Sequence, residues 1–304
     1  MNPVRQWVVD QYTRVTGRHD DPALYAGPAG DPGLVGPGSV SWEVHRDPAS
    51  VFIGGVAAII MEILHPSVMA GVQDLSGYRS QPFRRAETTF GYVVVTTFAG
   101  TEAAEAEIER VRRMHGRVHG TRPDGVPYRA LDPMLIGWVH TCIPWAVMRA
   151  FERYNRRLTP SERDRYLAEQ AVIGRKGGAG EIPVTAADLD DYVEAVRPQL
   201  AVNEQTREFF EFLLTAPFGP PLPSPVARPA RAYQLHAAMS VMPRWARRLT
   251  GFEHSGLAQR LFFEPQLQVA ACSLRPVFGV PPYAAMAEAR AARAPAHVPA
   301  AVPA

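Results

Sequence analysis

Three places in the chain carry the same helix-start signal, a capping residue followed at once by proline. They are Asp47-Pro48, Asp132-Pro133 and Thr159-Pro160. The capping side chain can accept a hydrogen bond from a free backbone N–H of the first turn, and proline at the first helical position lacks the N–H that would otherwise need a partner. Thr159 also opens a Thr-x-x-Glu capping box. These signals predict well-defined helices joined by turns.

The remaining sequence also favours helices over strands. Residues 92–98 are rich in β-branched side chains, but Arg85, Thr89 and Tyr92 recur at i, i+4 and i+7, the spacing of one helical stripe. No repeat and no convincing strand alternation is visible. With 304 residues, 46% of them hydrophobic, the chain can bury a large core. We predict an all-α fold with a single domain of about ten helices.

Composition divides the chain into three parts. Residues 1–40 are predicted to form an N-terminal helix, over 3–16, and an irregular Gly/Pro-rich arm. Residues 41–287 are predicted to form the helical domain. Residues 288–304 are rich in alanine and proline, which predicts a disordered tail.

Charge and targeting signals argue against several classes of protein. Lys+Arg 32 against Asp+Glu 30 gives no electrostatic reason to expect nucleic acid or an acidic membrane surface as a partner. The N-terminus lacks the apolar core of a signal peptide, and the longest apolar run, residues 56–60, is too short to span a bilayer. We therefore expect a cytoplasmic protein without an integral membrane segment. Cys142 and Cys272 leave both a disulfide and two free thiols open, and no Cys-x-x-Cys-His motif for covalent haem attachment occurs.

Residues 101–120 carry the most informative histidines. Thr101 is predicted to cap the start, and glutamates toward the start and arginines toward the end complement the helix dipole, which predicts one helix over this range. His115 shares a face with Ile108 and Val111, so it points inward as a core histidine or as a ligand. His119, one turn later, can reach the same metal or cap the helix. The residues alone leave the role of His115 open.

Other candidate residues are weaker when each is taken alone. Glu62-x-x-His65 is half of the paired motif in di-iron helical bundles, and no second half occurs, so His65 is more simply a helix-end residue. Arg85 and Thr89 lie four apart, and a buried guanidinium needs an anion, either a neighbouring carboxylate or a bound group such as a propionate. His140, on an apolar helix, is either structural or part of a pocket wall.

Taken together, the motifs resemble the catalytic domain shared by MpaB-type oxygenases and the latex-clearing proteins, which are rubber oxygenases. The matching motifs occur in order over about residues 33–215. They include Glu62-x-x-His65-Pro66, Ser76-x-Tyr78-Arg79, Arg85-x-x-x-Thr89-x-x-Tyr92, Met114-His115-x-x-Val118, Tyr128-x-Ala130-x-Asp132-Pro133 and Trp138-Val-His140.

The resemblance implies a globin-like, all-α core that holds one non-covalent haem b. The axial histidine of the family falls on His115, which makes it the expected iron ligand. The Arg-x-x-x-Thr pair of the haem pocket falls on Arg85 and Thr89. Tyr92 and His119 are expected beside the cofactor. We expect Arg85, Thr89 and His140 to take part in catalysis.

The implied activity is that of a haem-dependent oxygenase, an oxidoreductase that uses O2. Rubber-cleaving members carry Lys where this chain has Thr88, and many members carry His where it has Leu75. We therefore expect a small or lipid-like apolar substrate rather than an extracellular polymer. Oxidative cleavage, hydroxylation and desaturation are all open, as is the need for an electron donor.

Three alternatives stand beside this hypothesis. The first is a non-haem (di-)iron oxidase that uses Glu62, His65, His115 and His119. The second is a haem-binding or gas-sensing protein without turnover. The third is a helical interaction protein without a cofactor.

Overall fold

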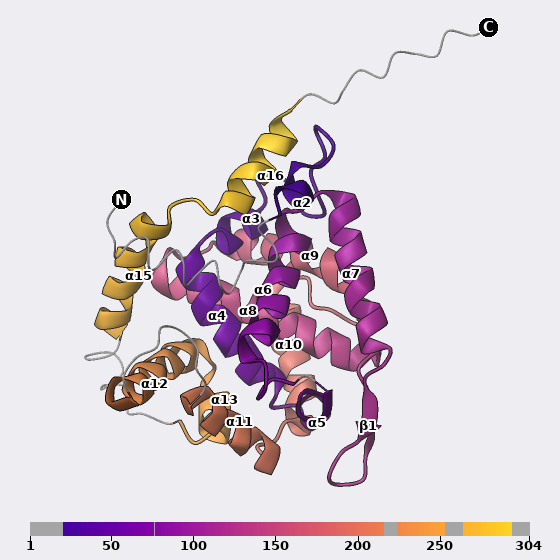
Figure 1. Ribbon diagram of the computed structural model, residues 1–304, viewed down its shortest axis with the longest axis vertical. Coiled ribbons are helices and arrows are strands. Elements are labelled where there is room, and N and C mark those ends of the chain that lie inside the picture. Colours follow the sequence, from indigo (N-terminus) through magenta and orange to yellow (C-terminus); the bar gives the residue numbers. More distant parts are fainter. Residues whose placement is uncertain (1–20, 76, 216–223, 253–263, 294–304) are drawn as a thin grey trace, which may run out of the picture.

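The computed structural model describes residues 21–75, 77–215, 224–252 and 264–293, so the helix predicted at 3–16 lies outside the described residues. The described part contains fourteen α-helices, a 3-10 helix and one antiparallel pair of short strands (Figure 1). The all-α fold class is confirmed, with more helices than the predicted ten. In chain order the elements are α2 (Pro22–Ala26), α3 (Val40–His45), α4 (Pro48–Glu62), α5 (Pro66–Leu75), α6 (Pro82–Phe98), α7 (Thr101–His115), β1 (His119–Thr121), β2 (Pro127–Arg129), α8 (Pro133–Tyr154), α9 (Pro160–Gly177), α10 (Ala186–Val196), η2 (Arg197–Gln199), α11 (Glu204–Thr215), α12 (Ser224–Val241), α13 (Arg244–Leu249), α15 (Glu264–Phe278) and α16 (Pro282–Ala292).

The three predicted helix starts are confirmed in atomic detail. Asp47 accepts a hydrogen bond from the backbone N–H of Ser50 at the start of α4, and Asp132 accepts one from Met134 at the start of α8. Both hydrogen bonds of the Thr159 capping box are present at the start of α9. The β-branched residues 92–98 lie in α6, as the polar stripe predicted.

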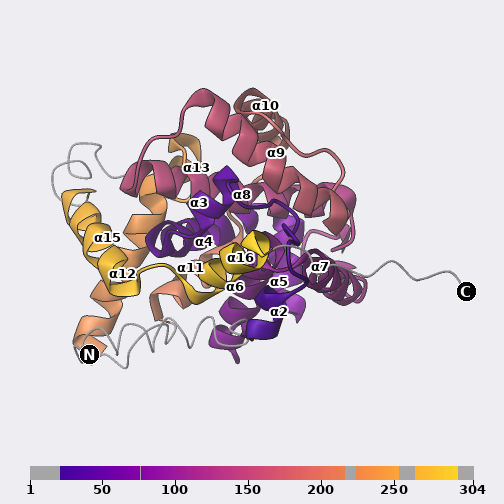
Figure 2. The ribbon, with the colours of Figure 1, turned by 90° about the horizontal axis from the view of Figure 1, so that it is seen from above.

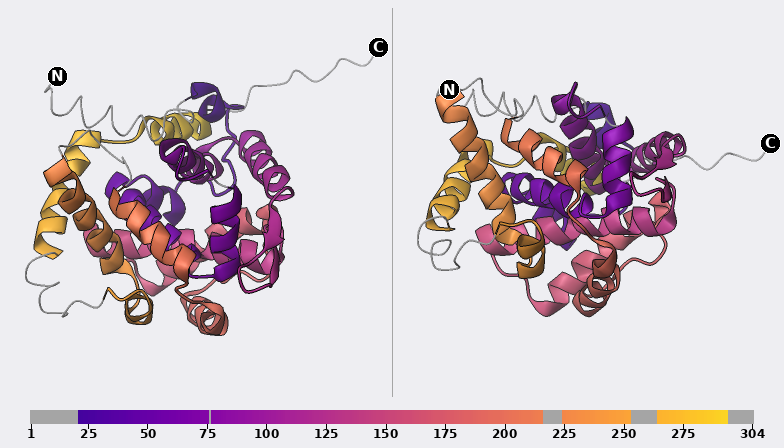
Figure 3. Two further views of the ribbon diagram at one scale, coloured as in Figure 1. Left: turned by 60° about the horizontal axis from the view of Figure 1, so that its bottom comes forward. Right: turned by 90° about the horizontal axis from the view of Figure 1, so that it is seen from below.

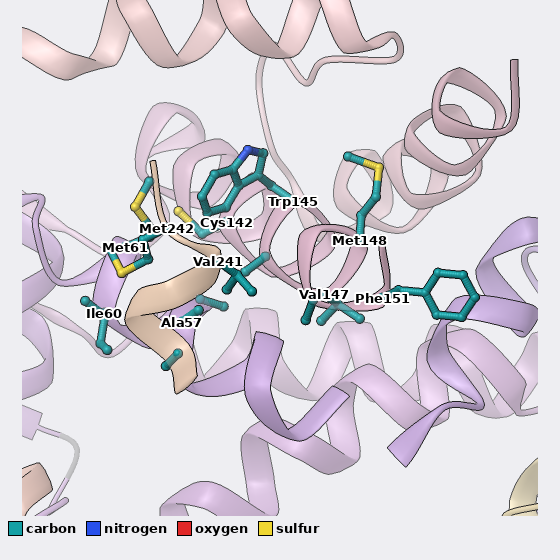
Figure 4. Packing of buried hydrophobic residues seen from close by; sticks show 14 of the residues in the cluster. Ala57, Ile60, Met61, Cys142, Trp145, Val147, Met148, Phe151, Val241 and Met242 are labelled. Carbon is teal, nitrogen blue, oxygen red and sulfur yellow. The ribbon is translucent and has the colours of Figure 1, made fainter. Parts of the chain in front are cut away.

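Helices α4 and α8 form the centre of the fold. Both are mostly buried, and Figure 2 shows them in the middle, with α9 and α10 along one side and α12 and α15 along another. Figure 4 shows apolar side chains of α4 and α8 in one cluster, with Val241, the last residue of α12, and the following Met242 beside Ala57, Ile60 and Met61 of α4. This packing buries most of the nearly all-apolar surface of α4.

A glycine allows the backbones of α4 and α8 to approach closely. A Cβ atom on Gly54 would lie 2.5 Å from the Cα and 2.8 Å from the backbone N of Val147. Real Cβ atoms do not come that close to a neighbouring backbone, so a side chain here must push the helices apart. The next residue, Gly55, has no atom within 4 Å of such a Cβ.

The start of α7 is capped by a residue from the N-terminal arm. The capping position is Gly100, which has no side chain, and Thr101 is the first helical residue rather than the cap we predicted. Asp31 Oδ2 accepts a hydrogen bond from the Thr101 backbone N–H at 2.7 Å, and Asp31 Oδ1 accepts one from the Thr101 hydroxyl at 2.6 Å. A carboxylate at this end also complements the helix dipole.

The C-terminal helix α16 fixes the arm that carries Asp31. Arg290 on α16 is fully buried, and its guanidinium donates hydrogen bonds to the carbonyl oxygens of Tyr25, Asp31 and Phe98. Figure 3 shows α16, in yellow, beside the indigo N-terminal segment. Residues 288–292, which we predicted to begin a disordered tail, are helical, so that boundary is wrong.

The chain leaves the helical conformation after His115 rather than at Gly120. Residues 119–121 and 127–129 pair as antiparallel strands, with His119 opposite Arg129. The prediction of one helix through residue 120 is therefore wrong, and so is the predicted placement of His119 one helical turn after His115. The Asp124-Gly125 pair at the tip was the available hairpin signal, and Gly125 adopts φ +87° there.

One described helix, α8, is long and apolar enough by length and composition to span a membrane. Its apolar window is 67% buried inside the protein, which is the pattern of a core helix. The bent pair of α4 and α5 would pass the same test only if the two helices were counted as one span.

We predict that Gly54→Ala lowers the free energy of unfolding by about 1–3 kcal/mol, because the added methyl group collides with the α8 backbone. Gly55→Ala, one residue along the same helix, should be neutral or stabilising by up to about 1 kcal/mol. Urea unfolding of both variants measures the difference. Equal effects would show that the helices are not in close contact at Gly54.

Candidate functional site

A cavity of about 630 Å³ lies between α5, α6, α7, α8, the end of α9 and the β1–β2 hairpin. Its volume falls within the roughly 300–1,000 Å³ of small-molecule and cofactor sites. Much of its wall is apolar. The aliphatic lining residues are Val68, Val72, Ile108, Val111, Met114, Val118, Leu135, Ile136, Val139 and Ile143.

Four of the residues predicted for the site line this one cavity. They are Thr89, Tyr92, His115 and His140, which come from α6, α7 and α8. His119 is not among the lining residues and is exposed on the hairpin. The side chain of Arg85 lies outside what the structure describes, so its predicted role stays a prediction.

His115 is the last residue of α7 and is half-buried at the cavity wall. The helix therefore presents an imidazole at its negative, C-terminal end, where a metal cation is electrostatically favoured. The following Gly116 donates its N–H to the carbonyl of Arg112 and ends the helix. His115 is thus held by a helix that is capped at its start by Asp31.

His140 contributes a second imidazole, whose tautomer is fixed by a hydrogen bond. Its Nε2 lies 2.9 Å from the carbonyl oxygen of Gln170, which can only accept, so Nε2 carries the proton. Nδ1 is then an acceptor. Burial lowers the pKa of His140 to about 4, so the ring is neutral near pH 7.

The backbone of α9 is shaped to admit this ring. A Cβ atom on Gly174 would collide with Cδ2 of His140 and with the side chain of Ile182. Glycine at this position therefore lets α9 close over His140. The neutral ring is packed on one side and faces the cavity on another.

Arginines also line the cavity, and they differ in their partners. Arg110 forms a bidentate pair with Glu107, with N–O distances of 2.7 and 2.6 Å. Arg112 donates to the carbonyl of Lys176 at 3.2 Å. Arg84 donates to the side-chain oxygen of Gln81 at 3.2 Å and has no acidic partner among the described residues. Its guanidinium is the one best placed to pair with an anionic group in the cavity.

Glu62 also reaches the cavity although it ends the mainly apolar helix α4. Glu62 is only 8% exposed to solvent. The pKa of the buried Cys142 thiol is raised, first by burial and second by the charge of Glu62. A charged residue in an otherwise apolar run was the sequence signal for this position.

The four residues of the non-haem alternative do not meet. Glu62 and His115 line the cavity, whereas His65 and His119 do not. His65 is buried, and its Nδ1 accepts the backbone N–H of Ser67 at 3.2 Å, which is a local helix-start role. Among the described residues, no group of three or more His, Cys, Asp or Glu side chains has metal-binding geometry.

Tyr128 is a lining residue that the predicted site did not include. Its hydroxyl donates to Asp74 Oδ2 at 2.7 Å, which ties the hairpin to α5 across the cavity wall. Burial, followed by this contact, raises the pKa of Tyr128 well above its usual value. The hydroxyl therefore stays protonated and acts as a donor.

The comparison with known families agrees with this architecture. Residues 42–271 match the catalytic domain of the family described as ER-bound oxygenase mpaB/B′ and rubber oxygenase. The chain belongs to this family of oxygenases, as the motifs had indicated, and is therefore assigned to the enzymes. No solved structure matches the chain significantly, so the globin-like form of the core stays a prediction.

Two mycobacterial relatives are similar over much of the chain. They are the uncharacterized proteins Mb2261 of Mycobacterium bovis and Rv2237 of Mycobacterium tuberculosis. Each is 28% identical over 213 residues, which is 68% of this chain and 82% of the relative. Their names assign no substrate.

We predict that His140 makes stability depend on pH. The unfolded imidazole binds a proton near pH 6.5 and the folded one only near pH 4, so stability is lost as the pH falls through this window. His140→Gln should reduce the loss between pH 7 and pH 5 by roughly 2 kcal/mol. Urea unfolding at the two pH values measures this. His119→Gln, on the exposed hairpin, is the control, and the same change in both variants would contradict the assignment.

Proposed function

We propose that this protein is a haem b-dependent oxygenase that acts with O2 on a small or lipid-like apolar substrate. The observation that carries the proposal is one histidine, His115, on the wall of a largely apolar cavity of about 630 Å³, in a chain of an oxygenase family. Both the cofactor and the substrate are held in the same cavity.

The donor set fits a haem better than a bare metal ion. A porphyrin supplies four nitrogen ligands to its iron, so the protein needs to add only one imidazole. A non-haem centre needs three or more protein ligands, and no such group occurs in the described part of the chain. The flat, apolar macrocycle also suits a wall of aliphatic side chains.

The chain would hold the cofactor at two kinds of contact. His115 would supply the nitrogen that holds the iron, and the fixed helix α7 sets the position of this side chain. Guanidinium groups would pair with the haem propionates, and Arg84 is available for this in addition to the predicted Arg85. Thr89 and Tyr92, on the facing stretch of α6, bound the space beside the ring.

The bound haem supplies the O2 chemistry, and the residues of the chain prepare the substrate for it. The aliphatic wall binds an apolar substrate and excludes water. His140 Nδ1, unprotonated at neutral pH, accepts a hydrogen bond or a proton from a donor group within the cavity. Thr89 can donate its hydroxyl hydrogen there. These roles make Thr89 and His140 the proposed catalytic residues, together with Arg85.

Titration of the purified protein with hemin tests the proposal. We expect a Soret band that saturates at one haem per chain and, after reduction, a spectrum that changes on adding CO. An apolar alkene or lipid substrate should then accelerate O2 consumption. No Soret band would contradict haem binding. Haem binding without O2 consumption across a panel of apolar substrates would favour a sensor over an oxygenase.

A further inference from the structure

One segment of this nearly neutral chain is rich in positive charge. Residues 112–134, here called the basic segment, contain five arginines and two aspartates, whereas the whole chain has a net charge of +2. The segment runs from the end of α7 through the β1–β2 hairpin to the start of α8. The overall charge balance therefore conceals a local basic surface.

Both acidic residues of the basic segment are already engaged, and Glu109, just before the segment, pairs with Arg112 and Arg113. Asp124 pairs with Arg122 at the hairpin tip, and Asp132 caps α8. Arg117 and Arg129 are exposed and have no acidic partner among the described residues. Arg129 lies opposite His119 on the outer side of the hairpin, while Tyr128 faces inward. The positive charges of Arg117 and Arg129 thus remain unneutralised on the outer surface.

Exposed apolar side chains lie among these arginines. Nine large hydrophobic residues are exposed in the described part of the chain, and four of them fall in the basic segment. They are Met114 at 36%, Val126 at 44%, Leu131 at 42% and Met134 at 37%. The Leu131 side chain lies beside Gly116, so the start and the end of the segment meet. Basic and exposed apolar groups therefore lie together in this one segment.

We propose that the basic segment docks this protein on an anionic lipid surface. Arginines attract acidic headgroups, and apolar side chains among them insert at the boundary of the acyl chains. A nucleic acid or an acidic protein would satisfy the charge but would gain less from isolated aliphatic side chains. The match to lipid is the combination of the two chemistries in one exposed segment.

Docking here would place the cavity wall against the lipid. Met114, His115, Val118, Tyr128 and Ala130 of the same segment line the cavity. An apolar molecule dissolved in the bilayer would then enter without crossing water. The docking itself depends on surface residues and does not require that the cavity bind haem.

Vesicle sedimentation tests the proposal. We expect the protein to bind phosphatidylcholine vesicles that contain phosphatidylglycerol, to bind pure phosphatidylcholine much more weakly, and to be released by salt. The double variant Arg117→Glu/Arg129→Glu should weaken binding at least tenfold, since each arginine near an anionic surface contributes roughly fivefold. Leu131→Asp should also weaken it at least fivefold.

Val269→Asp and Arg244→Glu serve as matched controls on exposed residues away from the basic segment. Val269 lies on α15, on the opposite side of the molecule from the hairpin in Figure 1. Both controls should bind anionic vesicles like the wild type. No binding by the wild type, or equal losses in the controls, would overturn the proposal. If vesicle binding were lost in the double arginine variant but unchanged in Leu131→Asp, the segment would be a general binding surface for polyanions. That result would also overturn the proposal.

Discussion

The hydrogen bonds that Thr101, the first residue of α7, donates to Asp31 hold the helix that carries His115. Asp31 lies in the N-terminal arm, and the buried Arg290 of α16 binds the arm through the carbonyl of Asp31. Burial alone would raise the pKa of Asp31, but its hydrogen bonds with Thr101 and Gly33 outweigh this and lower the pKa. The carboxylate is therefore charged at neutral pH. Both ends of the described chain thus help to position the candidate iron ligand.

Local signals in the sequence predicted much of the helical framework. Asp47, Asp132 and Thr159 each begin a helix because the hydrogen bond involved spans only two or three residues. In α6, the helical spacing of the polar residues predicted a helix, whereas the β-branched composition alone would have favoured a strand. The helix is what the structure contains, because the spacing of polar and apolar residues decides which side chains can be buried together. The close approach of α4 and α8 at Gly54 was not predictable, because it depends on a partner 93 positions away.

Long-range contacts account for the errors around His115. Thr101 was predicted as a cap, but the cap comes from Asp31, 70 residues earlier. The sequence pattern predicted that α7 continues to Gly120. In the structure, residues 119–121 pair with residues 127–129 as strands, so His119 is not part of the helix. The same spacing predicted only that His115 faces inward, and in the fold His115 lines the cavity. Family motifs, rather than periodicity, distinguished His115 from His119, and the fold now separates the two in space.

The most direct test of the central claim compares haem binding by His115→Ala and His119→Ala. We expect His119→Ala to bind hemin with the wild-type absorption spectrum. His115→Ala should bind it more weakly with a shifted Soret band, and added imidazole should restore the wild-type spectrum by filling the vacant ligand position. Normal haem affinity and an unchanged spectrum in His115→Ala would contradict the account.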